Sequence, residues 1–331
     1  MQPSVEMNPA VPASAEATIL RPAVLAGPES LSSAARAEIR ELSGHRPGRF
    51  LLELAWNWLV VAGVITLGVL ASNVFVTVLC ILLVGTRQMV FGLLLHEQVH
   101  RLGLRGKYGD WIVNVLAVYP LFATTVEDYA KVHLSHHKYF FTDKDPDFIR
   151  KSGEDWTFPA HWKVLARLVL RDLTGLNTVA LIKGKTGTAA MDEFTRTNPS
   201  PLWLRLGFYA LVAVVLTLVG GWTVFLVYWV IPLLTVTQLL VRWIAVIEHK
   251  YNMENATVYE TTPLIRLKPW QRLLIPDLNF AMHAYHHAHP GVSFSQLPKV
   301  HEIYKREGLV DESAIFDGQG AYLRYMLKRS R

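Results

Sequence analysis

Nine of the 13 histidines in this sequence fall in short clusters whose spacing is typical of metal ligands. The clusters are "HEQVH" at 96–100, "HLSHH" at 133–137, "EH" at 248–249 and "HAYHH" at 283–287. On a helix, residues three or four apart share a face, so each box can direct two or three imidazoles in one direction. Hydrophobic packing does not favour this repetition. We therefore predict that the metal ligands include His96, His100, His133, His136, His137, His283, His286 and His287. His249 stands alone at the end of another predicted span and is a ninth candidate.

The number of imidazoles indicates two metal ions. One zinc ion takes about four ligands, so eight or nine histidines better suit two first-row ions with four or five nitrogens each. Imidazole binds iron, zinc and copper alike, so this count does not select the metal. The single cysteine, Cys80, lies in an apolar run. It excludes disulfides within the chain, a cysteine-rich zinc site and a cysteine-ligated iron–sulfur cluster.

The first box, taken alone, also matches the H-E-x-x-H motif of zinc metalloproteases, with Glu97 as the base. That interpretation gives the later boxes no purpose. A carboxylate di-iron bundle would need the E-x-x-H motif twice, with two further carboxylates. We expect Glu97 instead to accept a hydrogen bond from a ligand histidine, since metal-bound imidazoles generally have such a partner. Asp145, Glu248 and Asn279 are further candidates for supporting contacts around the ligands.

The elements that position these histidines are predicted to be membrane helices. The chain has 331 residues, of which 51% are hydrophobic and only 18% charged, against about 25% in soluble domains. Four segments, at about 50–71, 74–95, 203–219 and 222–247, are long enough to cross about 30 Å of hydrocarbon. The short connections "ASN" and "GGW" join them in pairs. We predict an all-α integral membrane protein with four transmembrane helices in two hairpins and a cytoplasmic helical cap that holds the histidine boxes.

The distribution of basic residues predicts the orientation. Neither hairpin turn contains Lys or Arg, so the positive-inside rule places both termini and the cap, residues 96–202 and 248–331, in the cytoplasm. A further apolar stretch at 111–126 contains Asn114 and Pro120 and is short, so we expect it to be interfacial or re-entrant.

The N-terminal region is polar and precedes the predicted membrane domain. Residues 1–45 are rich in Ala, Pro, Ser and Glu and are predicted to form a flexible polar tail that ends in a short helix. Residues 46–331 are predicted to form a single domain.

Arg87 and Arg242 lie inside apolar segments and need partners or a position near the interface. For Arg242 we expect snorkelling to the cytoplasmic surface, and for Arg87 an ion pair or a helix-packing role.

With these motifs the chain resembles the membrane fatty-acid desaturase and hydroxylase superfamily over roughly residues 50–309. The order H-x-x-x-H, H-x-x-H-H, H-x-x-H-H carries the resemblance, and "YAKVHLSHHKYFFTDKDPD" and "HAYHHAHPGVSFSQLP" look like bacterial desaturase boxes. "RWIAVIEH" resembles the segment that supplies an additional histidine. The resemblance implies a non-haem di-iron centre held by the nine histidines. Ala245 stands where some relatives have an asparagine, so the surroundings of His249 can differ.

The resemblance also implies an activity and partners. We expect an O2-dependent lipid desaturase that introduces a cis double bond; a hydroxylase or ketolase is the close alternative and an intramembrane zinc protease the distant one. Expected partners are a lipid or acyl substrate, membrane-dissolved or a thioester, and a ferredoxin or cytochrome b5-type electron donor with its reductase. Membrane lipids are also expected, and nucleic acid is not; the expected location is the bacterial inner membrane. The substrate head group is expected among basic residues such as Arg150, Lys151, Lys163 and Arg167, and contacts of these residues with anionic membrane lipids are an equal alternative.

Overall fold

The computed structural model describes residues 20–122, 124–183 and 194–327, and it is mostly helical. The helices are α1 Ser33–Leu42, α2 Pro47–Ala71, α3 Val74–Val99, α4 Gly106–Val113, α5 Val126–Lys138, α6 Pro146–Arg150, α7 Trp162–Leu173, α8 Leu176–Lys183, α9 Leu202–Leu218, α10 Trp222–Phe225, α11 Ile231–Leu234, α12 Val236–Glu248, α13 Val258–Thr261, α14 Pro269–Leu274, α15 His283–Ala288, α16 Leu297–Arg306 and α17 Gln319–Met326. Shorter 3-10 or π turns are η1 Pro28–Ser30, η2 Asn114–Val118, η3 Tyr119–Leu121, η4 Glu154–Trp156, η6 Leu226–Val230, η7 Phe280–Met282, η8 Phe294–Gln296 and η9 Glu312–Ala314.

Strand structure is minimal in the described part of the chain. The two strands there, β1 Ile265–Arg266 and β2 Phe316–Asp317, pair in parallel with Ile265 opposite Phe316. The prediction of an all-α protein is therefore confirmed apart from this one short pairing.

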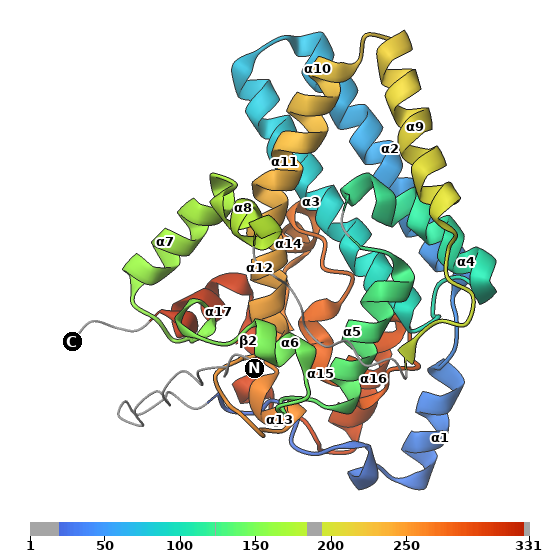
Figure 1. Ribbon diagram of the computed structural model, residues 1–331. Coiled ribbons are helices and arrows are strands. Elements are labelled where there is room, and N and C mark those ends of the chain that lie inside the picture. The colour runs from blue at the N-terminus through green and yellow to red at the C-terminus, as the bar shows by residue number, and fades with distance from the viewer. Residues whose placement is uncertain (1–19, 123, 184–193, 328–331) are drawn as a thin grey trace, which may run out of the picture.

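Helices α2 and α3 form the first hairpin. Their apolar composition and their lengths of 25 and 26 residues make both long enough to cross a membrane. The turn between them needs only two residues, because Ser72 adopts a positive φ of 45° and Asn73 caps α3 by accepting the N–H groups of Phe75 and Val76. Both helices stand upright beside α9 and α10–α12 in Figure 1. Most other elements gather around the lower end of these helices, away from the hairpin turns.

The second hairpin is less regular than the first. The stretch Trp222–Glu248 is the third helix long and apolar enough to cross a membrane, although a π turn at η6 and a break at Thr235 interrupt it. Pro232 contributes to this irregularity, because proline has no N–H to donate to the preceding turn. Helix α9 lies where a span was expected, but its 17 residues cover only about 25 Å. Three of the four predicted spans thus have the length and composition of membrane helices.

Helix α3 lies at the centre of the helical assembly. Its C-terminal two-thirds are almost wholly buried, and it packs against α2, α5 and α12. Gly85 permits the close crossing with α12, since a Cβ atom there would lie 2.6 Å from the side chain of Val236. The end of α3 that carries the first histidine box is therefore held on several sides.

The apolar stretch at 111–126 is bent, as its polar residues suggested. Helix α4 continues through η2 and η3, and the chain then turns by 90° into α5. Asn114 holds this turn: its side-chain oxygen accepts the N–H of Val126, and its amide donates to Glu127 at 2.8 Å. This path is that of a broken span or a re-entrant loop.

Residues 20–45 differ from the flexible tail that was expected; residues 1–19 lie outside the described chain. Ala35 and Ile39 of α1 are buried against Tyr285 of α15 and Tyr304 of α16. Backbone hydrogen bonds from Leu25 to Leu309 and from Gly44 to Gly291 add to this contact. The segment is polar in composition, but its few apolar residues share one face and cover the helix that carries the third histidine box.

The two arginines inside apolar segments are both buried. Arg242 does not snorkel as expected; its guanidinium forms a two-pronged ion pair with Asp172 of α7, with nitrogen–oxygen distances of 2.6 and 3.2 Å. Arg87 donates to the Thr86 hydroxyl and to the backbone carbonyl of Leu273. Among the described residues it has no carboxylate partner within 4 Å.

Candidate metal centre

Four parts of the chain bring the predicted ligands together. His96 lies in the last turn of α3 and His100 caps it; α5 carries the second box, His249 directly follows α12, and α15 carries the third box. These elements meet at one end of the upright helices (Figure 1). Helical spacing directs the imidazoles inward from each element, so residues separated by up to about 190 positions share one cluster.

One group of imidazoles gathers at the end of α3. One ligand nitrogen each from His96, His100, His133 and His286 lies within 4.8 Å of the other three. The Nε2 atoms of His100 and His133 are 2.9 Å apart. His137 lies beside this group, with its Nε2 atom 3.0 Å from that of His133 and 3.1 Å from that of His286.

A second group of imidazoles lies beside the first. It contains His136, His249 and His287, whose ligand nitrogens also lie within 4.8 Å of one another. The Nε2 atom of His249 is 3.3 Å from that of His136 and 3.0 Å from that of His287. These are the separations that two ligands of one ion would have.

His137 and His283 connect the two groups. The ring of His137 stacks on that of His287, with centroids 4.0 Å apart and an interplanar angle of 13°. The ring of His283 lies 4.8 Å from those of His249 and His287 and 5.1 Å from that of His286. All nine predicted histidines therefore occupy one continuous cluster.

The donor set fits a pair of metal ions better than a network of hydrogen bonds. Ligands about 2.1 Å from an ion and at right angles to each other lie about 3.0 Å apart, which matches the observed nitrogen separations. An imidazole nitrogen offers either one N–H or one in-plane lone pair, yet Nε2 of His133, His137 and His249 each faces two other nitrogens. Among the described residues, both ring nitrogens of His96 and Nδ1 of His283 are buried without a hydrogen bond. A metal bond would satisfy one nitrogen of each ring.

The imidazoles are held in the neutral form that binds metal. Burial, followed by the neighbouring histidines, holds the pKa of His283, His286 and His287 well below the usual value. Burial, assisted by Arg196, lowers the pKa of His100 to about 3. A neutral imidazole keeps the lone pair that a metal ion needs.

Two of the ligand histidines have partners that fix their tautomer. Nδ1 of His136 lies 2.8 Å from a carboxylate oxygen of Asp145, so it carries the proton and leaves Nε2 free to bind metal. Asp145 is itself held by the backbone N–H groups of Phe141, Asp147 and Phe148. Nδ1 of His249 lies 2.8 Å from the Thr262 hydroxyl. Asp145 was among the predicted supporting residues, whereas Thr262 was missed because no motif contains it.

The other three predicted supporting residues have no hydrogen bond to an imidazole within the described parts of the chain. The carboxylate of Glu97 accepts the backbone N–H of Phe294 at 3.3 Å. Asn279 donates to the Phe294 carbonyl and accepts from Arg272. Glu248 ends α12 and is half-buried. Glu97 and Asn279 thus hold the backbone around the third box rather than a ligand ring.

Aromatic side chains enclose the cluster. The ring of Phe280 meets that of His96 edge-on at 4.6 Å, and Phe140 lies 5.0 Å from His249. Tyr129 stacks on His133 at 5.6 Å. These contacts cover the rings of His96, His249 and His133. No spacing in the sequence indicates them, since aromatic residues are common in apolar segments.

The basic cluster expected to receive a head group does not form. Lys151 is buried, with its ammonium group 2.6 Å from both Asp147 and the Tyr251 hydroxyl. Arg150 also pairs with Asp147, and Arg167 pairs with Asp155. Lys163 is exposed on α7. Three of these four cations are therefore engaged in internal ion pairs.

Sequence comparison identifies the class of protein. Residues 72–315 match the fatty acid desaturase family, and this range includes all nine clustered histidines, so the chain belongs to that family. It is also 24% identical over 279 residues to the dihydrorhizobitoxine desaturase of Bradyrhizobium elkanii, in a match covering 80% of this chain and 78% of the relative. The protein is therefore an oxidoreductase of the desaturase type.

Proposed function

We propose that the protein is an O2-dependent di-iron enzyme that introduces a cis double bond into a fatty-acyl or other lipid substrate. The observation that carries the proposal is the pair of adjoining imidazole groups at the ends of membrane helices. One group offers four imidazole nitrogens and the other offers three, and His137 and His283 lie between the groups. This number of ligands suits two first-row ions.

In this proposal His96, His100, His133 and His286 hold one iron ion, and His136, His249 and His287 hold the other. Bound iron would supply the activation of O2 that removal of hydrogen from an unactivated C–H bond requires. The substrate gives up two hydrogens from neighbouring carbons. With two electrons from a donor and two protons, O2 is reduced to two molecules of water.

The protein's own contribution is to position the reactants and exclude water. Asp145 and Thr262 fix two imidazole rings, and the aromatic side chains of Phe280, Phe140 and Tyr129 cover part of the cluster. Neutral, buried histidines hold their lone pairs toward the ions at ordinary pH.

We further propose that α9 is the fourth membrane segment, so that residues 46–331 form one domain in the bacterial inner membrane, with residues 20–45 packed against it. The hairpin turns at Ser72 and Gly220 would lie on the far side of the membrane, because they lack basic residues. The histidine cluster and both termini would face the cytoplasm.

A pocket of about 550 Å³ beside His100 is a suitable docking place for the electron donor. His100 is among its lining residues, and its rim includes the exposed side chains of Arg101 and Arg105. It has no acidic lining residue among those described. We propose that an acidic electron-transfer protein, of ferredoxin or cytochrome b5 type and served by its reductase, docks here by charge complementarity.

Reconstitution tests the proposed activity. The iron-loaded protein, with a reduced donor and O2, is expected to convert an acyl lipid into a product two mass units lighter, detected by lipid mass spectrometry. The His136→Ala variant is expected to be inactive, and omission of O2 is expected to stop the reaction. A product heavier by one oxygen atom would assign a hydroxylase, and full activity of the variant would reject the proposed site.

A further inference from the structure

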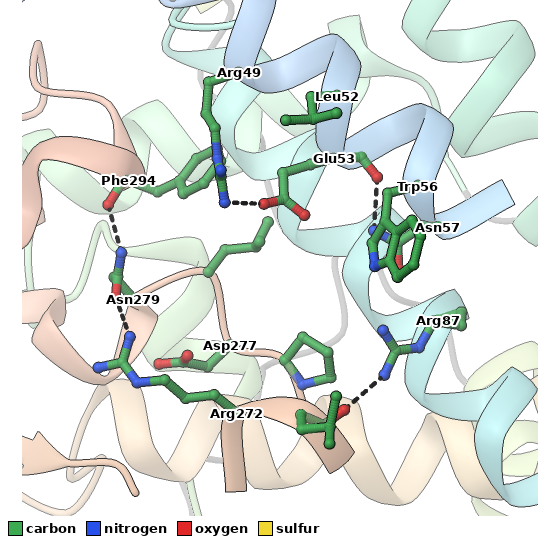
Figure 2. Close-up of a pocket in the computed structure, with 13 residues that line it drawn as sticks. Arg49, Leu52, Glu53, Trp56, Asn57, Arg87, Arg272, Asp277, Asn279 and Phe294 are labelled. Carbon is green, nitrogen blue, oxygen red and sulfur yellow. Dashed lines mark hydrogen bonds and ion pairs between the residues drawn. The ribbon is translucent and has the colours of Figure 1, made fainter. Parts of the chain in front are cut away.

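A pocket of about 440 Å³ lies between the first half of α2, the middle of α3 and the chain that follows α14. Figure 2 shows its charged lining residues, which include Arg49, Glu53, Arg87, Arg272 and Asp277. Three guanidinium groups therefore face two carboxylates across this space. No other feature of the proposed reaction uses them.

Two of the three arginines form no ion pair among the described residues. Arg49 pairs with Glu53 within α2, whereas Arg272 donates to the amide oxygen of Asn279. The carboxylate of Asp277 accepts the backbone N–H of Ala281. Arg87 forms hydrogen bonds only with the Thr86 hydroxyl and the Leu273 carbonyl in the described chain, and Glu53 acts on its charge from beyond ion-pair distance.

Arg87 is unusual for its depth. It is 7% exposed and lies nine residues before His96 on α3, about 13 Å nearer the membrane centre along the helix axis. A buried charge at such a depth costs several kcal/mol unless it is paired. An anionic group in the pocket would supply the missing partner, and a guanidinium binds carboxylate or phosphate through two parallel hydrogen bonds.

Asn57, which also lines the pocket, has a side-chain oxygen that needs a hydrogen-bond donor. Its amide donates to the Glu53 carbonyl, while its side-chain oxygen is buried and has no hydrogen-bond partner among the described residues. In Figure 2 Asn57 and Arg87 lie on the same side of the pocket. A ligand hydroxyl or amine next to the anionic group would satisfy this oxygen, because buried acceptors are almost always hydrogen-bonded.

The rim of the pocket indicates a ligand with an apolar tail. Leu52 and Trp56 on α2 and Leu273 on α14 are 58%, 56% and 75% exposed. Because α2 has the composition of a membrane helix, these side chains would face lipid. A small soluble anion would gain nothing from such a rim.

The pocket adjoins the histidine cluster. Leu278 and Asn279 line it and lead directly to Phe280, whose ring contacts His96. Phe294 also lines it, and its N–H group is bound by Glu97, the residue after His96. A molecule anchored here therefore lies one layer of side chains from the proposed ligands.

We propose that this pocket binds the anionic head group, a carboxylate or a phosphate, of the membrane-dissolved amphiphile on which the enzyme acts, with Arg87 as its principal contact. The inference rests on the proposed function and narrows its substrate class to anionic amphiphiles that enter from the membrane. It also explains why a cation is buried without an acidic partner at this depth.

Fluorescence quenching tests the proposal without turnover. The iron-loaded protein in non-ionic detergent is titrated with dibromostearate and with a brominated lysophosphatidylglycerol, and quenching of tryptophan emission is measured. Part of the quenching is expected to disappear in Trp56→Phe. Arg87→Gln is expected to weaken the binding of the preferred amphiphile about ten-fold, as for loss of a charge-assisted hydrogen bond, with a smaller effect for Arg87→Lys. Arg324→Gln, at an exposed position on α17, is the matched control and should bind unchanged.

The two amphiphiles distinguish the source of the anion, because tighter binding of one identifies a carboxylate or a phosphate. Arg272→Gln, on the pocket wall, replaces Arg87→Gln if that variant does not fold. Equal affinity of the unchanged protein and the arginine variants for both amphiphiles would overturn the proposal. Iron content measured in the same samples keeps this result separate from the di-iron proposal, since loss of iron and loss of binding are read independently.

Discussion

At the residue scale, the pairing of His136 with Asp145 controls how one imidazole is presented to a metal. A carboxylate at 2.8 Å keeps the proton on Nδ1 and leaves the lone pair of Nε2, which faces His249, free for a metal ion. Asp145 is fully buried and held by three backbone N–H groups, so its position is fixed before any metal binds.

Asp145→Asn is therefore expected to lower metal affinity or activity by about 10- to 100-fold, because the amide accepts a hydrogen bond without the negative charge. Iron content and turnover under limiting iron measure the effect. Asp143→Asn, on an exposed position of the same loop, is the control and should behave like the unchanged protein. If Asp145→Asn, like Asp143→Asn, binds iron and turns over as the unchanged protein does, the carboxylate of Asp145 does not support metal binding by His136.

Glu97→Gln separates the di-iron enzyme from a zinc protease. The glutamine oxygen can still accept the N–H of Phe294, and the carboxylate has no imidazole partner in the described chain, so lipid oxidation is expected to fall by less than about ten-fold. A protease would lose its general base and essentially all activity. Parallel assays of lipid oxidation and peptide cleavage distinguish the di-iron enzyme from the protease. Complete loss of lipid oxidation would instead assign the Glu97 carboxylate a direct chemical role.

The site could be predicted in part because ligand histidines repeat at helical spacing. That periodicity located eight of the nine clustered imidazoles, and the resemblance of "RWIAVIEH" to the family located His249. The acidic run after the second box located Asp145. Thr262 and Phe280 could not be found in this way. Their contacts with His249 and His96 depend on how distant segments pack, and threonine and phenylalanine are too common to signal a role.

At the element scale, a buried ion pair joins α12 to α7. Arg242 and Asp172 are 8% and 0% exposed, and the carboxylate accepts two hydrogen bonds from the guanidinium. Removing one partner leaves the other charge buried and unpaired, while removing both leaves an apolar contact.

Arg242→Met is therefore expected to lower the free energy of unfolding by about 3–5 kcal/mol, and addition of Asp172→Leu to recover most of that loss. Thermal unfolding in detergent, followed for both variants, measures the difference. If the double variant is no more stable than the single one, the contact does not act as a charge pair.

The elements themselves were predictable where composition determines them. Long apolar runs identified α2, α3 and the stretch 222–248, because about 20 apolar residues are needed to cross a membrane. The short helix at the end of the N-terminal region was predicted and is α1, but its docking was not predictable, since that depends on packing against α15 and α16. The partner of Arg242 was missed for a similar reason: it lies 70 residues away in sequence.

At the scale of the whole molecule, the fold brings histidines from four distant segments to one end of the membrane helices. Helix α3 is central to this arrangement, because it packs on α2, α5 and α12 and ends at the first box. The cluster has more imidazole nitrogens than one ion can bind, and in the described chain neither ring nitrogen of His96 has a hydrogen bond. Two ions in one site would use one nitrogen from each ring.

Metal analysis of the purified protein tests this central claim most directly. Protein produced in iron-supplemented cells is expected to contain about two iron atoms per chain, and His136→Ala and His286→Ala, one from each imidazole group, are each expected to contain clearly less. Near-stoichiometric zinc without iron, or an unchanged iron content in both variants, would contradict the account.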